Sequence, residues 1–406
     1  MSSGSSTKYV ILVPDGMADL PIPELEQRTP LEAAHTPWMD KVASRGRTGM
    51  TRTVPQGMDP GSDVANLSIM GYDPREVYSG RAPFEAAAMG IRLGDDDVAF
   101  RVNLVTLDRN YTFMSDHSAD HITSEEAREL VAAVAPMVES LGLSVYPGVS
   151  YRNILVWANG PVHCVTHPPH DFPGRPLDAK LPAGQGSDTL LRMIVESWRI
   201  LEHHPVNEAR VRQGLSAANS LWPWGQGKTP RMTPLQERFG ITGAVVSAVD
   251  LLRGIGWYAG LEILKVPGAT GYLDTNYQGK VEAALSALKA KDLVLVHVEA
   301  PDETSHSGKV DLKTQAIEDF DEKIVGPMLK GLEQFPQWRM LLMPDHPTPV
   351  SGRVHTGDPV PFVVLDSDQW VDSSPSNGPG FSEKAAQVSG WIEERADHLI
   401  EVLLER

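Results

Sequence analysis

The chain contains a single cysteine, Cys164, among its 406 residues. An intramolecular disulfide is therefore impossible, and the sequence requires neither an oxidising nor a reducing compartment. Long apolar runs are also missing, because no window approaches the roughly 20 apolar residues that a helix needs to cross a bilayer. The first residues are polar, and the apolar run after them is about five residues long, too short for the core of a signal peptide. We therefore expect a cytoplasmic protein that does not enter a membrane.

Positive charge is scarce as well, with 36 basic residues against 53 acidic ones and a formal net charge of −17. A general nucleic-acid or anionic-membrane binder needs a basic surface to neutralise phosphates, so both classes of partner are excluded. An anionic small molecule would need positive charge gathered locally, from metal ions or a few arginines. The Gly-x-x-x-x-Gly-Lys-Ser/Thr loop of many nucleotide-binding proteins is absent, which counts against a kinase. Whether the chain forms a homo-oligomer is left open.

The length favours two domains, each with its own apolar core. Strand-like and helix-like segments alternate at the start of the chain and again from about Gly240, while the middle part has a different pattern. We predict an α/β domain with a central, mostly parallel sheet flanked by helices from residues 1–94 and 240–406, and a smaller α+β domain, residues 95–239, inserted into it. The predicted strands include 9–13, 101–107, 154–157, 293–298 and 340–343; the predicted helices include 36–45 with a Thr36 cap, 63–70, and 124–141 with an incomplete Ser-x-x-Ala cap.

Three apolar, strand-like runs are each followed by residues of metal-binding type. Residues 9–13 lead to an aspartate, 293–298 to an aspartate with a histidine four residues later, and 340–343 to an Asp-His pair with another histidine beyond it. In open α/β sheets, functional residues gather beyond the carboxyl ends of the strands. The four-residue spacing would also place Asp302 and His306 on one face of a helical turn. The candidate ligands are Asp15, Ser62, Asp302, His306, Asp345, His346 and His355.

Ser62 is the candidate nucleophile. It follows a loop rich in Pro and Gly, residues 55–61, and stands at the start of a predicted helix. Free backbone N–H groups and the positive end of the helix dipole favour an anion at such a position. Carboxylates and neutral imidazoles suit borderline divalent ions such as Mn²⁺ and Zn²⁺. Two ions beside the serine would neutralise a phosphoryl group and lower the pKa of the hydroxyl, so that Ser62 carries the phosphate covalently.

Several motifs resemble known proteins. The ligand set, the Pro60-Gly61-Ser62-Asp63 turn and the Thr36-Pro37-Trp38-Met39-Asp40 segment resemble the alkaline phosphatase superfamily. Longer segments resemble the archaeal-type cofactor-independent phosphoglycerate mutases, and this likeness covers nearly the whole chain. These segments are 61–74 (GSDVANLSIMGYDP), 78–88 (YSGRAPFEAAA), 97–106 (DVAFRVNLVT), 202–210 (EHHPVNEAR) and 268–277 (GATGYLDTNY).

The resemblance implies an alkaline-phosphatase-like fold and the interconversion of 3-phosphoglycerate and 2-phosphoglycerate through a phosphoserine, without bisphosphoglycerate. It implies two divalent metal ions, with Mn²⁺ as the first choice and Zn²⁺, Mg²⁺ or Co²⁺ as alternatives. Metal 1 would bind Asp302, His306 and His355, and metal 2 would bind Asp15, Ser62, Asp345 and His346. The inserted domain would hold glycerate and exclude water, which would otherwise hydrolyse the phosphoserine.

The carboxylate of glycerate is bound best by the forked guanidinium group of arginine. The candidate substrate contacts stand at family-like positions and are Arg81, Arg101, Asn103, Arg152 and Lys228. Each charged member is equally compatible with a solvated or salt-bridged surface residue. In the HCVTHPPH segment, residues 163–170, we favour His170 with Asp171 as a pair that handles a proton near glycerate, over a third metal bound with Cys164.

Two segments depart from the resembled family. In the DHSADH segment, residues 116–121, His117 and His121 would replace the positive charge of an arginine that is frequent there. The Trp222-Pro223-Trp224 segment is similar to a bacterial branch, and its aromatic rings fit either a lid or a core. The neighbouring pair His203 and His204 is interpreted as structural.

Three alternative functions remain open. A related phosphotransferase acting on another small hydroxylated substrate, in the manner of a homoserine kinase, would share this architecture. A metal-dependent phosphatase would result if the inserted domain failed to exclude water. A non-catalytic metal-binding protein would keep the fold, although the intact Ser62 argues against it. A single aspartate at a strand end often caps a helix, so the prediction rests on the whole ligand set.

Overall fold

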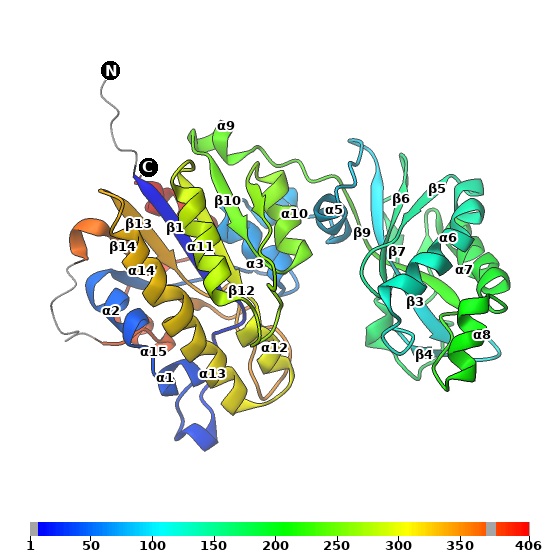
Figure 1. Ribbon diagram of the computed structural model, residues 1–406, viewed down its shortest axis with the longest axis horizontal. Coiled ribbons are helices and arrows are strands. Elements are labelled where there is room, and N and C mark those ends of the chain that lie inside the picture. Colours follow the sequence, from blue (N-terminus) through cyan, green and yellow to red (C-terminus); the bar gives the residue numbers. More distant parts are fainter. Residues whose placement is uncertain (1–6, 371–378, 406) are drawn as a thin grey trace. The chain divides into compact units, whose positions relative to one another are not determined.

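The computed structural model describes residues 7–370 and 379–405, in two compact units (Figure 1). Unit 1 combines the chain up to Val77 with the chain from Met232 onward, and unit 2 consists of Tyr78–Arg231. The boundaries predicted from the sequence, after residues 94 and 239, both come later in the chain than the observed boundaries, which follow Val77 and Arg231. No helix in the described ranges has the length and apolar character needed to cross a bilayer.

Two short helices account for the shifted boundaries. The alanines of helix α5 (Ala82–Ala88) pack with Ala99 and Ile154 of the unit 2 sheet, so this helix belongs to the smaller unit. The first residue of helix α9 (Leu235–Phe239) donates its N–H to the carbonyl of Ala259 in unit 1 at 2.9 Å. The sequence-based boundaries were placed where the residue pattern changes. The observed boundaries depend instead on which unit each helix packs against.

Unit 1 is built on an eight-stranded sheet in which most neighbouring strands are parallel, and strand β14 is antiparallel to both of its neighbours. In spatial order the strands are β11 (Glu262–Leu264), β10 (Gly243–Val246), β12 (Leu293–Val298), β1 (Lys8–Pro14), β13 (Trp338–Leu342), β14 (Val360–Asp366), β2 (Arg47–Thr51) and β15 (Ile392–Glu393). The predicted α/β class with a central, mostly parallel sheet is confirmed.

Strand β1 occupies the middle of this sheet, between β12 and β13 (Figure 1). It runs parallel to both neighbours, with Leu12 opposite Val296 on one side and Leu342 on the other. The side chains of residues 10–13 are completely buried. A parallel strand that helices cover on both faces needs such a continuous apolar run, which is why the sequence predicted this strand without alternation.

Helices cover both faces of the unit 1 sheet. Figure 1 shows α11, α13 and α14 along one face, where their buried side chains share a core with Val10 and Leu12. Helix α10 lies on the other face and places Gly256 against Val245. The helices of unit 1 are α1 (Pro30–Ala33), α2 (Pro37–Arg45), α3 (Ser62–Ile69), α4 (Pro74–Val77), α9, α10 (Asp250–Tyr258), α11 (Tyr277–Leu288), α12 (Ala300–His306), α13 (Val310–Phe320), the π-helix η3 (Asp321–Val325), α14 (Gly326–Leu332), α15 (Glu383–Val388) and α16 (Leu399–Leu404), with 3₁₀ turns η1 (Pro23–Leu25), η4 (Ser367–Gln369) and η5 (Ala396–His398).

Unit 2 contains a five-stranded antiparallel sheet centred on β3, which pairs with β4 and β6 on one side and β9 on the other. Its strands are β3 (Val98–Leu107), β4 (Met114–Asp116), β5 (Leu143–Tyr146), β6 (Arg152–Trp157) and β9 (Ser220–Lys228), beside a separate pair β7 (Cys164–Val165) and β8 (Ala183–Gly184). Its helices are α5, α6 (Ser124–Ser140), η2 (Pro169–Asp171), α7 (Ser187–Leu201) and α8 (Pro205–Arg212). An antiparallel sheet with helices packed against it fits the predicted α+β domain.

Two predicted helix caps differ in the structure: Thr36 stands at the N-cap position of α2 without capping it through its side chain, and the predicted cap of α6 is wrong. The side chain of Thr36 makes no cap bond to helix α2, and its hydroxyl instead lies 3.4 Å from a carboxylate oxygen of Asp40. Helix α6 is capped by Thr123 rather than Ser124. The Thr123 hydroxyl accepts the N–H of Glu126, and the Glu126 carboxylate accepts the N–H of Thr123, which completes a capping box one residue upstream of the predicted cap.

A buried ammonium group ties together the segments that follow β1, β12 and β13. Lys313 in α13 is completely buried, and its Nζ donates to the carbonyl of Ala18 at 3.1 Å, to Asp19 Oδ2 at 2.8 Å and to the carbonyl of Thr348 at 2.9 Å. All three ammonium protons therefore have acceptors, as a buried lysine requires. Asp19 lies beyond β1 and Thr348 beyond β13, while α13 directly follows α12, so Lys313 joins all three segments.

Candidate active site

Three segments of unit 1 bring ligand-type side chains to the same edge of the sheet. Asp15 follows β1, Asp302 lies in α12 just beyond β12, and Asp345 and His346 follow β13. Because β1 is parallel to both β12 and β13, the carboxyl ends of the three strands meet at this edge. The structure brings all seven predicted ligands together there, six of them in two adjoining groups and Ser62 beside them.

Asp15, Asp345 and His346 form the first group. Their ligand atoms lie within 4.8 Å of one another, and all three side chains are buried. His346 Nε2 is 3.6 Å from Asp15 Oδ1 and 3.5 Å from Asp345 Oδ2. The backbone N–H groups of Gly16 and His346 donate to Asp345 Oδ1 at 3.0 and 2.8 Å, which fixes the direction of this carboxylate.

Asp302, His306 and His355 form the second group. His306 Nε2 lies 3.1 Å from Asp302 Oδ2 and 3.0 Å from His355 Nε2, and His355 Nε2 lies 3.3 Å from Asp302 Oδ1. The ligand atoms of Asp302, His355 and His346 also lie within 4.8 Å of one another. His346 therefore stands between the two groups, whereas the resemblance assigned it to one metal.

The first group has the charge of a divalent-cation site. Burial, followed by the nearby carboxylates of Asp345 and Asp302, raises the pKa of Asp15 well above its usual value. Asp15 Oδ1 is buried and has no hydrogen-bond partner among the described residues, so it is an acceptor that a cation would satisfy. Carboxylate oxygens with imidazole nitrogens are a donor set for borderline divalent ions. The residues present fit such an ion.

The second group has opposite shifts, because its histidines supply positive charge. Burial alone would raise the pKa of Asp302, but hydrogen bonds from His306 and His355 outweigh it and hold this pKa well below the usual value. The same contact with Asp302 raises the pKa of His306 to about 9. A proton and a metal ion bind the same lone pair of an imidazole nitrogen, so they compete for it. Protonated His306 is therefore in the state that a metal ion would replace.

Ser62 is the first residue of α3, and its Oγ lies 3.1 Å from His346 Nε2. The residue before it, Gly61, has no side chain to cap the helix, although the Asp63 carboxylate accepts the N–H of Val64 at 2.9 Å, and the positive end of the helix dipole lies beside the serine. Ser62 is partly exposed, while residues 63–69 of the same helix are buried. The hydroxyl is thus accessible at the rim of both ligand groups.

Two positioning residues near the first group were not predicted. His297 is completely buried in β12, and its Nε2 lies 2.9 Å from Asp15 Oδ2. Asn66 follows Ser62 by one helical turn, and its Nδ2 donates to the Ser62 carbonyl and to Asp345 Oδ2, both at 2.9 Å. A histidine inside the apolar run LVLVHV was a usable signal for His297. The role of Asn66 has no signal in the sequence, because it depends on the distant residue Asp345.

Unit 2 gathers basic side chains from the predicted substrate contacts. Arg81 Nε and Arg101 Nε form ion pairs with the two carboxylate oxygens of Glu85, at 3.1 and 3.0 Å. Burial lowers the pKa of Arg101 to about 10, with Glu85 opposing the shift and the nearby Arg81 and Arg152 adding to it. Arg101 therefore remains a cation near neutral pH. One carboxylate between several guanidinium groups leaves positive charge for an anionic ligand.

Trp224 links this cluster to the predicted proton-handling pair. Its ring lies under the guanidinium of Arg101 at 4.2 Å, its Nε1 donates to Asn103 Oδ1 at 2.9 Å, and the ring of His170 lies 5.1 Å away. His170 Nε2 is 3.8 Å from Asp171 Oδ1, and burial lowers the pKa of His170. Trp224 is buried, so it forms part of the core beneath the cluster.

The remaining predicted residues of unit 2 lie elsewhere. Lys228 is at the Val98 end of β3 and forms an ion pair with Asp96 at 3.4 Å. Cys164 directs its thiol toward the carbonyl of Ala183 at 3.4 Å. Both candidate metal-ligand groups found within the described ranges belong to unit 1. His204 caps α8 by accepting the N–H of Val206, the structural role expected of it.

The DHSADH segment contains an unusual turn. Ala119, Asp120 and His121 all have left-handed backbone conformations, with φ of 49°, 53° and 50°. Residues other than glycine adopt this conformation at a cost of roughly 1–3 kcal/mol each. The turn places the rings of His117 and His121 against Tyr151, at centroid distances of 5.8 and 6.1 Å.

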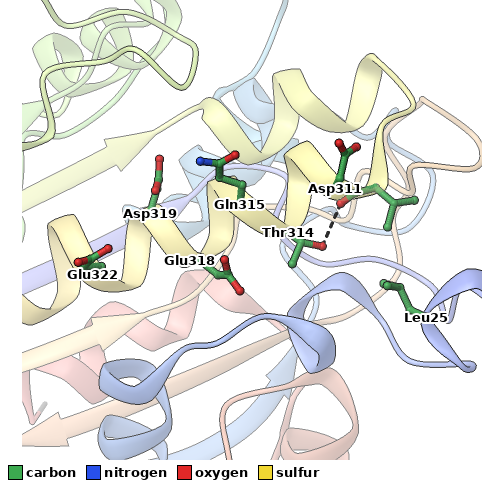
Figure 2. A pocket seen from close by; sticks show the side chains of 8 residues that line it. Leu25, Asp311, Thr314, Gln315, Glu318, Asp319 and Glu322 are labelled. Carbon is green, nitrogen blue, oxygen red and sulfur yellow. Dashed lines mark hydrogen bonds between the residues drawn. The ribbon is translucent and has the colours of Figure 1, made fainter.

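A separate surface hollow lies along helix α13 (Figure 2). Figure 2 shows the carboxylates of Asp311, Glu318, Asp319 and Glu322 around it, with Leu25 at one end. The residues that line it include no basic side chain and none of the predicted ligands. Because like charges repel, this hollow does not suit a phosphorylated anion.

Comparison with known proteins gives the family. The family model described as 2,3-bisphosphoglycerate-independent phosphoglycerate mutase matches residues 43–207. A probable 2,3-bisphosphoglycerate-independent phosphoglycerate mutase of Geobacter sulfurreducens is 50% identical over 401 residues, which cover 98% of this chain and 100% of the relative. The chain belongs to the 2,3-bisphosphoglycerate-independent phosphoglycerate mutase family.

Two further relatives agree with this family. A mutase of the same description from Methanothrix thermoacetophila is 52% identical over 398 residues, covering 98% of this chain and 99% of the relative. The solved structure of the cofactor-independent phosphoglycerate mutase from Thermoplasma acidophilum is 27% identical, with a TM-score of 0.65 and coverage of 98% of this chain and 99% of that one. The mutase family that the sequence motifs resemble is therefore confirmed, and with it the class of isomerase.

Proposed function

We propose that this mutase interconverts 3-phosphoglycerate and 2-phosphoglycerate through a phosphoserine on Ser62, with two divalent ions, Mn²⁺ first, held by the two ligand groups. The observation that carries the proposal is the position of Ser62, which begins helix α3 and places its Oγ 3.1 Å from His346 Nε2. His346 itself stands between the two ligand groups. Ions bound there would neutralise phosphoryl charge and lower the pKa of the serine hydroxyl. The enzyme needs no bisphosphoglycerate, because Ser62 itself carries the phosphoryl group between the two hydroxyls.

The reaction consists of two displacements on phosphorus. In the first, Ser62 Oγ forms a bond to phosphorus, the bond from phosphorus to the 3-oxygen of glycerate breaks, and the serine proton is transferred to the released alkoxide. In the second, the 2-oxygen of glycerate forms a bond to phosphorus, the bond from phosphorus to Ser62 Oγ breaks, and the proton of the 2-hydroxyl is transferred to Ser62 Oγ. The backbone N–H groups at the start of α3 favour the phosphoryl charge in both steps. Glycerate must stay bound to the enzyme between the first and the second displacement, so its carboxylate needs a binding group.

We assign glycerate binding to the basic cluster of unit 2. Arg101, with Arg81 and Arg152 nearby, offers the guanidinium forks that suit a carboxylate, and Asn103 lies beside them on β3. His170 with Asp171 remains the proposed pair for moving protons near the glycerate hydroxyls. Lys228 stays a predicted contact, although its ion pair with Asp96 offers it another role.

Arg101→Met should lower kcat/KM for 3-phosphoglycerate by about 10–100-fold, mainly through KM, because a hydrogen bond to a charged group contributes roughly 1.5–3 kcal/mol. The matched control is Arg192→Met, which breaks an exposed Arg–Glu pair on α7 of the same unit. Steady-state kinetics of both variants, with Lys228→Met in the same series, measure the effect. An Arg101→Met enzyme with the kinetics of the Arg192→Met control would remove Arg101 from the binding site.

The proposed function itself is tested by supplying 3-phosphoglycerate with Mn²⁺ and coupling the product to enolase. We expect 2-phosphoglycerate to form, with little free phosphate. Release of phosphate without 2-phosphoglycerate would indicate a phosphatase instead. Transfer of phosphate from a nucleotide to homoserine, with no activity on 3-phosphoglycerate, would indicate the related phosphotransferase.

A further inference from the structure

We propose that Thr348 is a positioning residue that couples the two metal-ligand groups through a single hydroxyl. This inference rests on the proposed metal centre. Thr348 follows His346 by two residues in the segment beyond β13, and its side chain is completely buried. Thr348 Oγ1 lies 2.5 Å from Asp302 Oδ1, in one group, and 3.2 Å from His346 Nδ1, in the other.

The hydrogen-bonding capacity of the three groups fixes the direction of each contact. A threonine hydroxyl has one proton to donate, and an ionised carboxylate can only accept. The proton of Thr348 therefore goes to Asp302, and the hydroxyl oxygen accepts a proton from His346 Nδ1. His346 is thereby held with its lone pair on Nε2, the nitrogen that faces Asp15, Asp345 and the hydroxyl of Ser62.

The hydroxyl is itself held rigidly. The N–H of Thr348 donates to the carbonyl of Ala18 at 3.1 Å, and its carbonyl accepts from the buried ammonium of Lys313 at 2.9 Å. Gly16 closes the other side, since a Cβ at this position would come within 2.7 Å of Thr348 Oγ1 and 2.5 Å of Asp302 Oδ1. The backbone of Thr348 is thus tied to the segment beyond β1 and to helix α13, and its side chain has little freedom to move away from either ligand.

Removal of the hydroxyl should weaken metal binding by about 10–100-fold, the usual effect of losing an outer partner of a metal ligand. The test is Thr348→Val, which keeps the shape of the side chain. Mn²⁺ is titrated into metal-free protein and followed by calorimetry, so that the readout does not depend on turnover. Because Thr348 contacts one ligand of each group, both binding events should weaken. Thr348→Ser, which restores the hydroxyl, should return both affinities to within about threefold of the unsubstituted protein.

The matched control is Thr304→Val. Thr304 is also completely buried, lies in α12 between Asp302 and His306, and donates its hydroxyl only to backbone carbonyls, those of Ala300 and Pro301. Its loss should leave the Mn²⁺ affinities within about twofold while removing a comparable hydrogen bond. Circular dichroism establishes that each variant is folded, and Thr348→Ala replaces Thr348→Val if the valine variant is not.

The outcomes separate this inference from the proposed function. If the unsubstituted protein binds no Mn²⁺, the metal centre and the inference both fail. If it binds two ions but Thr348→Val binds them equally well, or loses affinity at one site only, the metal centre stands and the coupling role of Thr348 is wrong. If Thr348→Ser loses as much affinity as Thr348→Val, the hydroxyl is not the cause, and the inference is again wrong.

Discussion

Replacing Ser62 with alanine is expected to reduce turnover of 3-phosphoglycerate by on the order of 10⁴-fold or more, because the variant cannot form the phosphoserine. The loss should appear in kcat, since no substrate contact is removed. Incubation with substrate labelled at phosphorus should leave label on the unsubstituted enzyme after acid quenching and none on Ser62→Ala. The ligand groups keep Asp15, Asp345, His346, Asp302, His306 and His355, so the variant should still bind two Mn²⁺ ions.

The control for this variant is Ser68→Ala on the same helix. The Ser68 hydroxyl donates to the carbonyl of Thr53 at 2.6 Å and is buried, so its removal tests whether a serine on α3 matters for folding alone. We expect this control to keep activity within a few-fold. Turnover by Ser62→Ala at the rate of the control, or label that persists on the variant, would exclude the covalent mechanism.

Removal of divalent ions by excess EDTA should abolish activity, and Mn²⁺ should restore it. Without a cation, the site offers an incoming phosphoryl group the buried carboxylates of Asp15, Asp302 and Asp345, which would repel it. The ions would supply the positive charge that neutralises the phosphoryl group. The rate before chelation, after chelation and after addition of Mn²⁺, Zn²⁺, Mg²⁺ or Co²⁺ gives both the dependence and the preferred ion. Full activity in the presence of the chelator would contradict the metal centre.

A folding control accompanies the chelation. The core of the sheet around Val10 and Leu12 does not involve the ligands, so far-ultraviolet circular dichroism should change little when ions are removed. A large loss of secondary structure would mean that inactivation reflects unfolding. The same sample after Mn²⁺ addition then shows whether structure and activity return together.

The sequence predicted those parts of the fold that depend on local pattern. Continuous apolar runs marked β1 and β12 because a parallel strand buried on both faces tolerates little else. Ligands at the ends of such strands were predictable for the same reason, since parallel strands end at one edge of a sheet. The start of α3 at Ser62 followed from the Pro- and Gly-rich loop before it.

Features that depend on distant residues were missed or misplaced. The boundary before α5 was misplaced because only its burial against Ala99 and Ile154 reveals that it belongs to unit 2. Lys313 reads as an ordinary helix residue, yet its buried contacts with Ala18 and Thr348 span 295 and 35 positions of sequence. The contacts of the Thr348 hydroxyl could not be predicted from the sequence either. Residue type and spacing identify candidate ligands, but not the buried partners that orient them.

The order of the chain in the two units bears on how the protein is made. Unit 2 is one continuous stretch, whereas unit 1 joins the chain up to Val77 to the chain from Met232 onward. The contact between Gly16 and Asp345 closes 329 positions of sequence. During synthesis unit 2 can therefore fold as soon as it leaves the ribosome, whereas β1 cannot pair until β12 and β13 have been synthesised. Ser62 is made early, but the newborn chain has no complete ligand set until synthesis has passed His355.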